Sequence, residues 1–321
     1  MSKFDEQYLE LCDKILTHGE RVVNYKSVSD AARSKKTANT MPNHVAQAKL
    51  GSATIRIPHY TLEFDLEEEF PILTTKFVAF KTAVLEMLWI WQVQSNEVKW
   101  LHDRGVKIWN EWEVPEDGIY MGRDFKKLYA EKGLKENPVG TIGTAYGWIV
   151  NRYQLTQSLI ETLKNEPTNR RMVMSLWQNE WLPTAALPSC VWSNEWIVSG
   201  DRLNLMVHSR SNDAPLGLPF NITQYAVFLS LVAQVVGKKP GKFTFTINDA
   251  HIYENQIDGI KEQLARRDAI LKEKGKMYDA PKLWINPEVK DFFKFDNSKE
   301  LKDIKLIDYK HQGRIKMPIT A

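Results

Sequence analysis

The chain has 321 residues, 43% of them hydrophobic, and contains 11 tryptophans, so it is long enough for a large buried core. Its 43 basic and 40 acidic residues nearly balance, which argues against a nucleic-acid-binding protein that works through bulk positive charge but permits local attraction of a phosphorylated ligand. With two cysteines, no secretory pattern in residues 1–6 and no long apolar run, the sequence predicts a cytoplasmic protein without membrane contact.

The first third of the chain predicts two helices, a strand and a long polar segment. Residues 4–18 place apolar side chains on one helical face, and Gly19 ends that helix. Residues 25–52 are polar and lack a clear period, which predicts an insertion, and residues 53–64 alternate as a strand. A helix over residues 79–93 places Glu86 among apolar neighbours. Because glutamate is rarely buried without a reason, this position predicts either an ion pair or a carboxyl group with a tuned pKa.

The middle of the chain contains aromatic and basic pairs. A short helix over residues 96–104 leads to Trp109 and Trp112, a pairing that more often belongs to a core than to a ligand platform. Residues 122–141 are rich in lysine and predict a second, solvated insertion. A helix over residues 154–165 precedes Arg170 and Arg171, which stand before a strand over residues 172–177. Two arginines at a strand entrance are either solvated or able to clamp a phosphate.

Residues 187–225 combine a thiol, a guanidinium, a carboxylate and a carboxamide beside turns and strand ends. Cys190 precedes a strand over residues 192–198, a hairpin turn at residues 199–201 and a second strand. In hairpin register Arg210 approaches Cys190, where its charge lowers the pKa of the thiol and favours the nucleophilic thiolate. A structural cysteine and a solvated arginine are the alternative. Cys12 lies on the first predicted helix as a small core residue, and counting alone leaves a Cys12–Cys190 disulfide open.

The last third predicts a buried helix and further strands. Residues 221–236 are apolar nearly all round, which is typical of a central helix, with Asn221 at its N-terminal end. A strand over residues 242–247 leads to Asp249, His251 and Tyr253. A helix over residues 254–266, a third charged insertion at residues 267–279 and a last strand over residues 283–285 follow. Because strands and helices mix without βαβ alternation, we predict an α+β class, with one domain over residues 1–321 and a mixed β-sheet covered by helices.

Motifs spread over residues 60–321 resemble, in order and spacing, those of the folate-dependent thymidylate synthases. They occupy residues 70–76, 86–89, 108–112, 145–147, 169–171, 188–191, 210–213, 216–221, 248–253 and 283–287. The resemblance implies methylation of deoxyuridine monophosphate (dUMP) to thymidine monophosphate (dTMP). It also implies 5,10-methylenetetrahydrofolate as the donor of carbon and hydride, dihydrofolate as the second product, and no metal.

The resemblance also implies roles for individual side chains. Cys190 would attack pyrimidine C6, Glu86 would organise a proton relay at O4, and Tyr146 would assist removal of the C5 proton. The implied catalytic residues are Cys190, Glu86, Tyr146, Arg210, Asn221 and Asp213. Asn221 would read the uracil edge, because a carboxamide carries both a donor and an acceptor.

The implied ligand contacts divide between nucleotide and folate. The nucleotide set is Arg170, Arg171, Arg210, Ser211, Asn212, Asp213, Asn221, His251 and Tyr253. Arg170 and Arg171 would be donated across a homodimer interface, and His251 and Tyr253 would bind the sugar hydroxyl. The folate set is Trp109, Trp112, Asp213, Thr320 and Ala321.

Two departures from the family pattern stand out. Val191 replaces a histidine that commonly follows the catalytic cysteine, which removes an imidazole from beside the base. The N-terminal phosphate loop has two candidate cations, Arg33 and Lys49, and the sequence does not choose between them.

Two other functions compete with the synthase. One is a dUMP or dCMP hydroxymethylase, against which Trp109, Trp112 and the C-terminal tail argue because hydride transfer requires that water be excluded. The other is a non-catalytic nucleotide- or RNA-binding relative. The retained Cys190, Glu86 and Tyr146 argue against that alternative, and nucleic acid is therefore not an expected partner.

Overall fold

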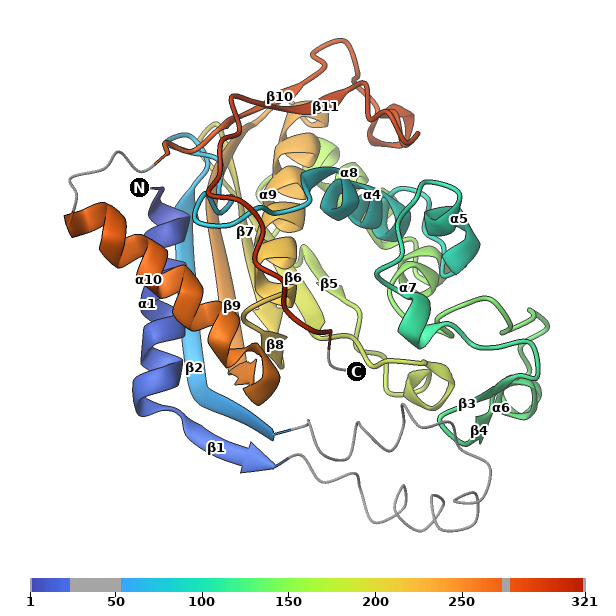
Figure 1. Ribbon diagram of the computed structural model, residues 1–321. Coiled ribbons are helices and arrows are strands. Elements are labelled where there is room, and N and C mark those ends of the chain that lie inside the picture. Colours follow the sequence, from blue (N-terminus) through green and yellow to red (C-terminus); the bar gives the residue numbers. More distant parts are fainter. Residues whose placement is uncertain (1, 24–52, 273–277, 320–321) are drawn as a thin grey trace.

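The structure is a computed structural model of the chain, and it describes residues 2–23, 53–272 and 278–319 (Figure 1). The first predicted insertion, at residues 25–52, lies outside the described residues. The same is true of four candidate site residues, which are Arg33, Lys49, Thr320 and Ala321.

A seven-stranded sheet forms the centre of the fold. Its strand order is β1-β2-β9-β7-β6-β5, and β8 pairs with β9. The strands are β1 (Glu20–Val23), β2 (Ala53–Asp65), β5 (Val173–Ser175), β6 (Val191–Ser199), β7 (Arg202–Ser209), β8 (Asn212–Asp213) and β9 (Lys239–Tyr253). Most neighbours are antiparallel, but β7 and β8 run parallel to β9. The predicted mixed sheet and α+β class are therefore confirmed.

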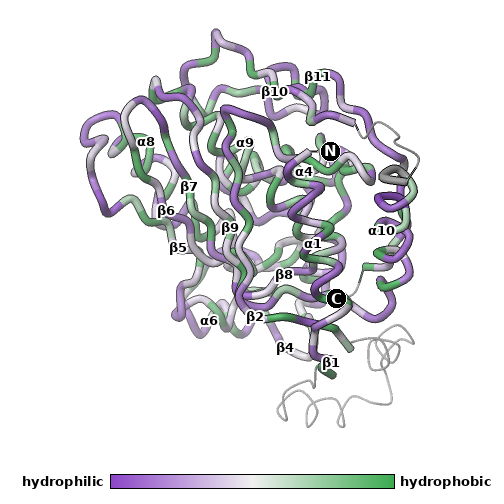
Figure 2. The backbone as a smooth tube through the Cα atoms, turned by 90° about the vertical axis from the view of Figure 1, so that its left-hand side faces the viewer, coloured by the Kyte–Doolittle hydropathy of each residue, from purple (hydrophilic) through white to green (hydrophobic). Residues whose placement is uncertain are grey.

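Helices cover one face of this sheet. Helices α1 (Lys3–His18) and α9 (Gly217–Val235) pack on the strands, α4 (Phe80–Trp91) packs on α9, and α10 (Ile257–Lys272) packs on α1. Seen from the side, α1, α4 and α10 lie together on one side of β2 and β9 (Figure 2). Helix α1 begins where the Ser2 hydroxyl accepts a hydrogen bond from the Asp5 backbone N–H, and it ends at Gly19.

Helix α9 is the predicted central helix, and nearly every face of it is buried. It begins at Gly217, four residues earlier than predicted, because Pro219 falls in the first turn, where a missing N–H is tolerated. Asn221 therefore lies one turn inside the helix and not at its N-terminal end. In the described part of the chain, α9 alone has the length and hydropathy of a membrane span. Because 83% of that window is buried inside the protein, the apolar composition of α9 serves the core.

Three predictions about the less regular segments need correction. Within residues 122–141, the hairpin β3 (Ile119–Tyr120) and β4 (Arg123–Asp124) leads into α6 (Phe125–Glu131), and Phe125 and Tyr129 are buried, so this segment is not simply solvated. Helix α10 continues to Lys272, into the predicted third insertion, and residues 273–277 lie outside the description. Strand β10 (Lys282–Ile285) is not the last strand, because it pairs with β11 (Ile304–Ile307).

The remaining helical elements are short connections that support the main layers. They are α5 (Val98–His102), α7 (Gly147–Arg152), α8 (Leu155–Asn165), and the 3-10 turns η1 (Asn110–Trp112), η2 (Leu182–Thr184), η3 (Glu254–Gln256) and η4 (Phe292–Lys294). Both cysteines are free, which rules out the disulfide between them.

Candidate active site

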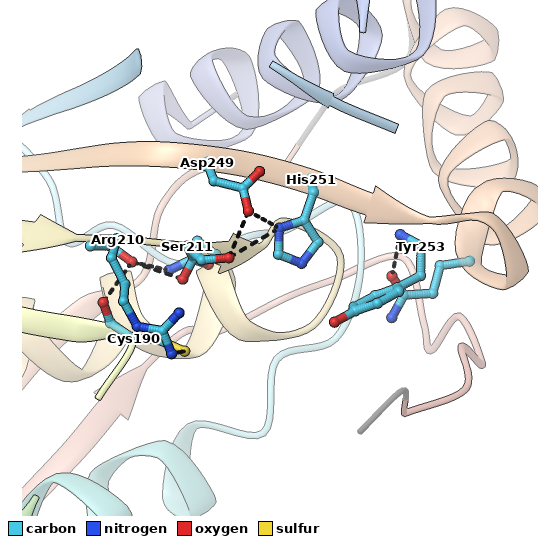
Figure 3. A network of polar contacts seen from close by, with 9 residues as sticks. Cys190, Arg210, Ser211, Asp249, His251 and Tyr253 are labelled. Atoms are coloured by element: carbon cyan, nitrogen blue, oxygen red, sulfur yellow. Dashed lines mark hydrogen bonds and ion pairs between the residues drawn. The ribbon is translucent and has the colours of Figure 1, made fainter. Parts of the chain in front are cut away.

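The β6–β7 hairpin brings Cys190 and Arg210 together, as predicted, with a bulge between Val191 and Ser193 that shifts the register by one residue. The Arg210 backbone N–H donates to the Cys190 carbonyl at 2.9 Å, and its Nη2 lies 3.7 Å from the Cys190 sulfur (Figure 3). The guanidinium is fixed by two backbone carbonyls, because its Nε donates to Ser189 at 3.0 Å and its Nη2 to Pro188 at 2.7 Å. The chain before the thiol thus orients the cation that faces the thiol.

The electrostatics of Cys190 correct one expectation. The Arg210 guanidinium does lower the pKa of the thiol, but burial raises that pKa by more, so the net pKa lies above its ordinary value. This net direction disfavours the thiolate in the described chain. Nucleophilic attack therefore requires that the thiol lose its proton to a base or that further positive charge arrive beside the sulfur.

Tyr146 holds the backbone at the nucleophile. Its hydroxyl oxygen accepts a hydrogen bond from the Cys190 backbone N–H at 3.0 Å, which leaves its own O–H available as a donor. Tyr146 stands immediately before α7 with φ at 45°, and its ring packs on Trp109 with centroids 5.3 Å apart. Burial raises the pKa of Tyr146 well above its usual value, so the phenol remains protonated.

Glu86 has a tuned pKa and no ion pair within the described ranges. Its Oε1 accepts the indole N–H of Trp109 at 2.7 Å, and its Oε2 accepts the amide of Gln224. Burial raises the pKa of Glu86 to about 7, although both hydrogen bonds oppose that rise. Gln224 was missed from the sequence, where its signal was an uncharged polar side chain on a helix that is apolar nearly all round.

A pair of asparagines joins β8 to α9. Asn212 is buried, and its Nδ2 donates to the Asn221 Oδ1 at 3.0 Å and to the Ser209 hydroxyl at 3.2 Å. The Asn212 Oδ1 is buried and has no hydrogen-bond partner among the described residues. The Asn221 carboxamide is thereby held in one orientation beside an unsatisfied acceptor, an arrangement that suits recognition of a polar ligand.

Strand β9 supplies a second polar group to the site, with side chains shown in Figure 3. The Ser211 hydroxyl donates to Asp249 Oδ2 at 2.8 Å, and His251 Nδ1 lies 3.4 Å from the same oxygen. His251 and Tyr253 are two positions apart on the strand, so they share one face, with ring centroids 5.1 Å apart. Asp249 was noted on this strand but not as a site residue, although it links Ser211 to His251.

Asp213 lies at the junction of β8, α9 and η3. Its Oδ1 accepts the Leu216 backbone N–H at 3.2 Å, and its Oδ2 accepts the Gln256 amide at 3.3 Å. Burial raises the pKa of Asp213 despite these bonds. Lys76 is buried nearby and donates to the Pro215 carbonyl. This bond connects the segment before α4 to the segment that follows Asp213.

Two predicted site residues, Arg170 and Arg171, lie apart from this cluster, and Trp112 lies at its edge. Arg170 and Arg171 are exposed on the segment before β5, and within the described chain their side chains form no hydrogen bond or ion pair. Trp112 is partly buried and packs edge-on against Trp109, with centroids 5.4 Å apart. No group of three or more metal-ligating side chains occurs in the ranges that the structure describes.

A partly buried thiol beside a fixed guanidinium, with a partly buried carboxyl group of raised pKa and a phenol close by, is typical of an enzyme of covalent, nucleophilic catalysis. Residues 6–321 match the family described as thymidylate synthase. The chain is 43% identical over 321 residues to the thymidylate synthase of Clostridium beijerinckii and 36% identical over 330 residues to that of Bacillus licheniformis, and both alignments cover 100% of each protein. The solved thermostable thymidylate synthase A from Bacillus subtilis is similar with a TM-score of 0.75 and 34% identity, covering 99% of both chains.

The chain belongs to the thymidylate synthase family, the folate-dependent methyltransferases that convert dUMP to dTMP. This membership favours the synthase over the hydroxymethylase and over the non-catalytic relative. It also implies methylenetetrahydrofolate as the co-substrate.

Proposed function

We propose that Cys190 is the nucleophile of this methyltransferase and forms a covalent bond to C6 of dUMP. The observation that carries this proposal is the placement of the Cys190 sulfur 3.7 Å from the Arg210 Nη2, in a partly buried site whose backbone is held by Tyr146. When the thiol loses its proton and the sulfur bonds to C6, the pair of electrons of the C5–C6 double bond moves toward C5 and O4. C5 then becomes the nucleophile that accepts the one-carbon unit.

Glu86 and Tyr146 handle the protons of this sequence. A carboxyl group with a pKa of about 7 can both donate and accept a proton near neutral pH, which suits a relay to the pyrimidine O4. The Tyr146 phenol remains protonated and is fixed against the Cys190 backbone, which suits it to orient the water or base that removes the C5 proton.

The nucleotide is recognised by amide and basic groups around the thiol. Asn221 presents its donor and acceptor to the uracil edge, with its orientation set by Asn212. His251 and Tyr253 contact the sugar hydroxyl from one face of β9. Arg210 and Ser211 bind the phosphate, which takes charge-assisted hydrogen bonds well.

The folate side of the site contains Trp109, Trp112 and Asp213, with Thr320 and Ala321 from the tail. Methylenetetrahydrofolate supplies the one-carbon unit and the hydride, and dihydrofolate is released. Asp213 fits such a ligand because a partly buried carboxylate presents oxygen acceptors to ring N–H groups. Trp109 excludes water from the reacting carbon with its indole, which is fixed on Glu86.

The enzyme is proposed to be a homodimer that works in the cytoplasm. Arg170 and Arg171 are exposed and form no ion pair within the described chain, so they are free to reach the phosphate of a second subunit. The outer face of the sheet also exposes Trp192, Ile197 and Met206, at 39%, 56% and 40%. Exposed apolar side chains gathered on one sheet face support an interface there.

Replacement of the thiol tests the central proposal. Cys190→Ser should reduce turnover by at least about a thousandfold, because a serine hydroxyl is far less ionised than a thiol near neutral pH. Binding of dUMP, measured by calorimetry without folate, should persist. Turnover close to that of the unsubstituted enzyme would remove Cys190 from the mechanism.

A further inference from the structure

Gln256 is a fully buried side chain whose hydrogen-bonding groups are all engaged. Its Oε1 accepts the Tyr253 backbone N–H at 3.2 Å. Its Nε2 donates to Asp213 Oδ2 at 3.3 Å and to the Pro318 carbonyl at 3.1 Å. A carboxamide offers two N–H donors and a carbonyl acceptor, so these three bonds match what the group can provide.

The three partners of Gln256 come from separate parts of the fold. Tyr253 ends β9, Asp213 lies on β8, and Pro318 belongs to the C-terminal tail that descends in front of α9 in Figure 1. They also correspond to three parts of the proposed site, since Tyr253 contacts the sugar, Asp213 contacts the folate, and the tail supplies the last residues of the folate set. Within the described residues, Gln256 is the one side chain that forms hydrogen bonds with Tyr253, Asp213 and Pro318.

The tail lies along α10 before it reaches Gln256. Gly259 lies one turn after Gln256, and a Cβ at that position would come within 2.8 Å of the Met317 side chain. Further along α10, Arg266 donates to the carbonyl of Gln312 at 2.8 Å and to that of Gly313 at 3.5 Å. Helix α10 therefore guides the tail over residues 312–318 and brings its backbone to the Gln256 amide.

We propose that Gln256 is a positioning residue that ties the seated C-terminal tail to the Asp213 carboxylate and so makes folate binding depend on the tail. This inference rests on the proposed contact between Asp213 and folate. With the tail seated, the Gln256 amide is held by the Pro318 carbonyl and aims its second N–H at Asp213, which fixes the carboxylate. Without the tail the amide loses one of its two acceptors, and the carboxylate loses a fixed orientation.

Two substitutions test the hydrogen bonds by which Gln256 connects the tail to Asp213. Gln256→Glu keeps the acceptor for the Tyr253 N–H but removes the donors to Asp213 and Pro318 and adds a charge that repels Asp213. Gln256→Met keeps the length of the side chain and removes all three bonds. Loss of a hydrogen bond to a charged group weakens an interaction about tenfold to a hundredfold. Both variants should raise the KM for methylenetetrahydrofolate by about that factor, while the Kd of dUMP measured without folate changes less than about threefold.

Gln263→Met provides the matched control. Gln263 lies in α10, is equally buried and donates to the Thr75 hydroxyl at 2.8 Å. Arg266 donates to the backbone carbonyl of the same threonine. Gln263 itself forms no bond to Asp213 or to the described part of the tail. This variant should lower the thermal unfolding midpoint as Gln256→Met does, yet leave the folate KM within about threefold of the unsubstituted value. An equal rise of the folate KM in Gln263→Met would overturn the proposal, because general loosening of α10 would then explain both effects.

A double-mutant cycle tests the dependence on the tail. A chain that ends at Met317 lacks the Pro318 carbonyl and should itself bind folate poorly. Combining that truncation with Gln256→Met should add little further loss, because the two changes break one connected unit. Folate losses that simply multiply would show that Gln256 and the tail act separately, and the proposal would fail.

A binding measurement separates this inference from the proposed function. Tetrahydrofolate lacks the reactive one-carbon unit, so its Kd on the dUMP-loaded protein reports binding without turnover. If the unsubstituted protein binds tetrahydrofolate but forms no dTMP, the proposed function fails while the Gln256 variants still test the role of Gln256. If the unsubstituted protein forms dTMP and both Gln256 variants bind tetrahydrofolate as tightly as the unsubstituted protein, the proposed function stands. The proposed role of Gln256 between the tail and Asp213 then fails.

Discussion

Trp109 donates its indole N–H to Glu86 Oε1 at 2.7 Å, and this bond opposes the burial that raises the pKa of Glu86 to about 7. The carboxyl group is thus balanced between desolvation, which favours the neutral acid, and two donors, which favour the carboxylate. The resemblance implies that Trp109 contacts folate, and its hydrogen bond also influences the pKa of Glu86, the proposed proton relay.

This balance predicts a pH shift in a tryptophan variant. Trp109→Phe removes a donor that stabilises the carboxylate, so the pKa of Glu86 should rise further. The limb of the kcat/KM profile that reports Glu86 should therefore move to higher pH. Trp112→Phe is the control, because Trp112 contacts the Trp109 ring but donates nothing to Glu86. A limb that stays in place in Trp109→Phe would show that Glu86 does not control it.

Gly147 controls the placement of Tyr146 through close contact with another backbone segment. A Cβ on Gly147 would lie 2.0 Å from the Ser95 carbonyl oxygen, and neither backbone can yield easily. Gly147→Ala should therefore destabilise the fold by about 1–3 kcal/mol and reduce kcat, because α7 and the Tyr146 hydroxyl must shift. The matched control is Gly217→Ala, since a Cβ there meets its nearest atoms at 3.6 Å. Denaturant unfolding and initial rates measure both variants, and equal stability in the two would contradict this account.

Asn221 is predicted to decide which pyrimidine is accepted. Cytosine presents the reverse donor and acceptor pattern at the positions that a carboxamide reads, so Asn221 favours uracil. Asn221→Asp should lower the preference for dUMP over dCMP by about tenfold or more, because a protonated carboxyl can both donate and accept. Competition between the two nucleotides, followed by product analysis, measures the ratio. Full uracil selectivity in the variant would place base reading elsewhere.

Shared active sites predict complementation between inactive chains. Cys190→Ser lacks the nucleophile, and Arg170→Ala/Arg171→Ala lacks the donated arginines, so neither homodimer should turn over. In a mixed dimer one site combines an intact thiol with intact arginines, and part of the activity should return. The assay requires proof that subunits have exchanged, for example by differently tagged chains. Failure to regain activity after proven exchange would argue against donation across the interface.

Much of the site was predictable because it depends on contacts that are local in sequence. The turn at residues 199–201 and the alternation on both sides of it set the β6–β7 pairing, and a bulge between Val191 and Ser193 then shifts that pairing by one residue, which brings Arg210 to Cys190. Likewise, two positions on a strand share a face, so His251 and Tyr253 had to stand together. The apolar composition of residues 221–236 was sufficient to predict a buried helix, although not its first turn.

Other features depended on contacts between distant segments, which no local pattern encodes. Whether Glu86 meets a cation or an amide was decided by the packing of α4 on α9, which brings Gln224 to it from 138 positions away. The net rise in the pKa of Cys190 depends on how deeply the finished fold buries the sulfur, and sequence shows only the cation.

The sequence by itself therefore determined the fold class, the hairpin that pairs thiol with guanidinium and, through its motifs, the family. Only the tertiary structure decided the partners of the buried polar groups, among them Gln224 on Glu86 and Gln256 between Asp213 and Pro318. The physical reason is that hydrophobic patterning specifies which face turns inward, whereas a buried polar atom takes whichever donor or acceptor the packed layers bring within about 3 Å.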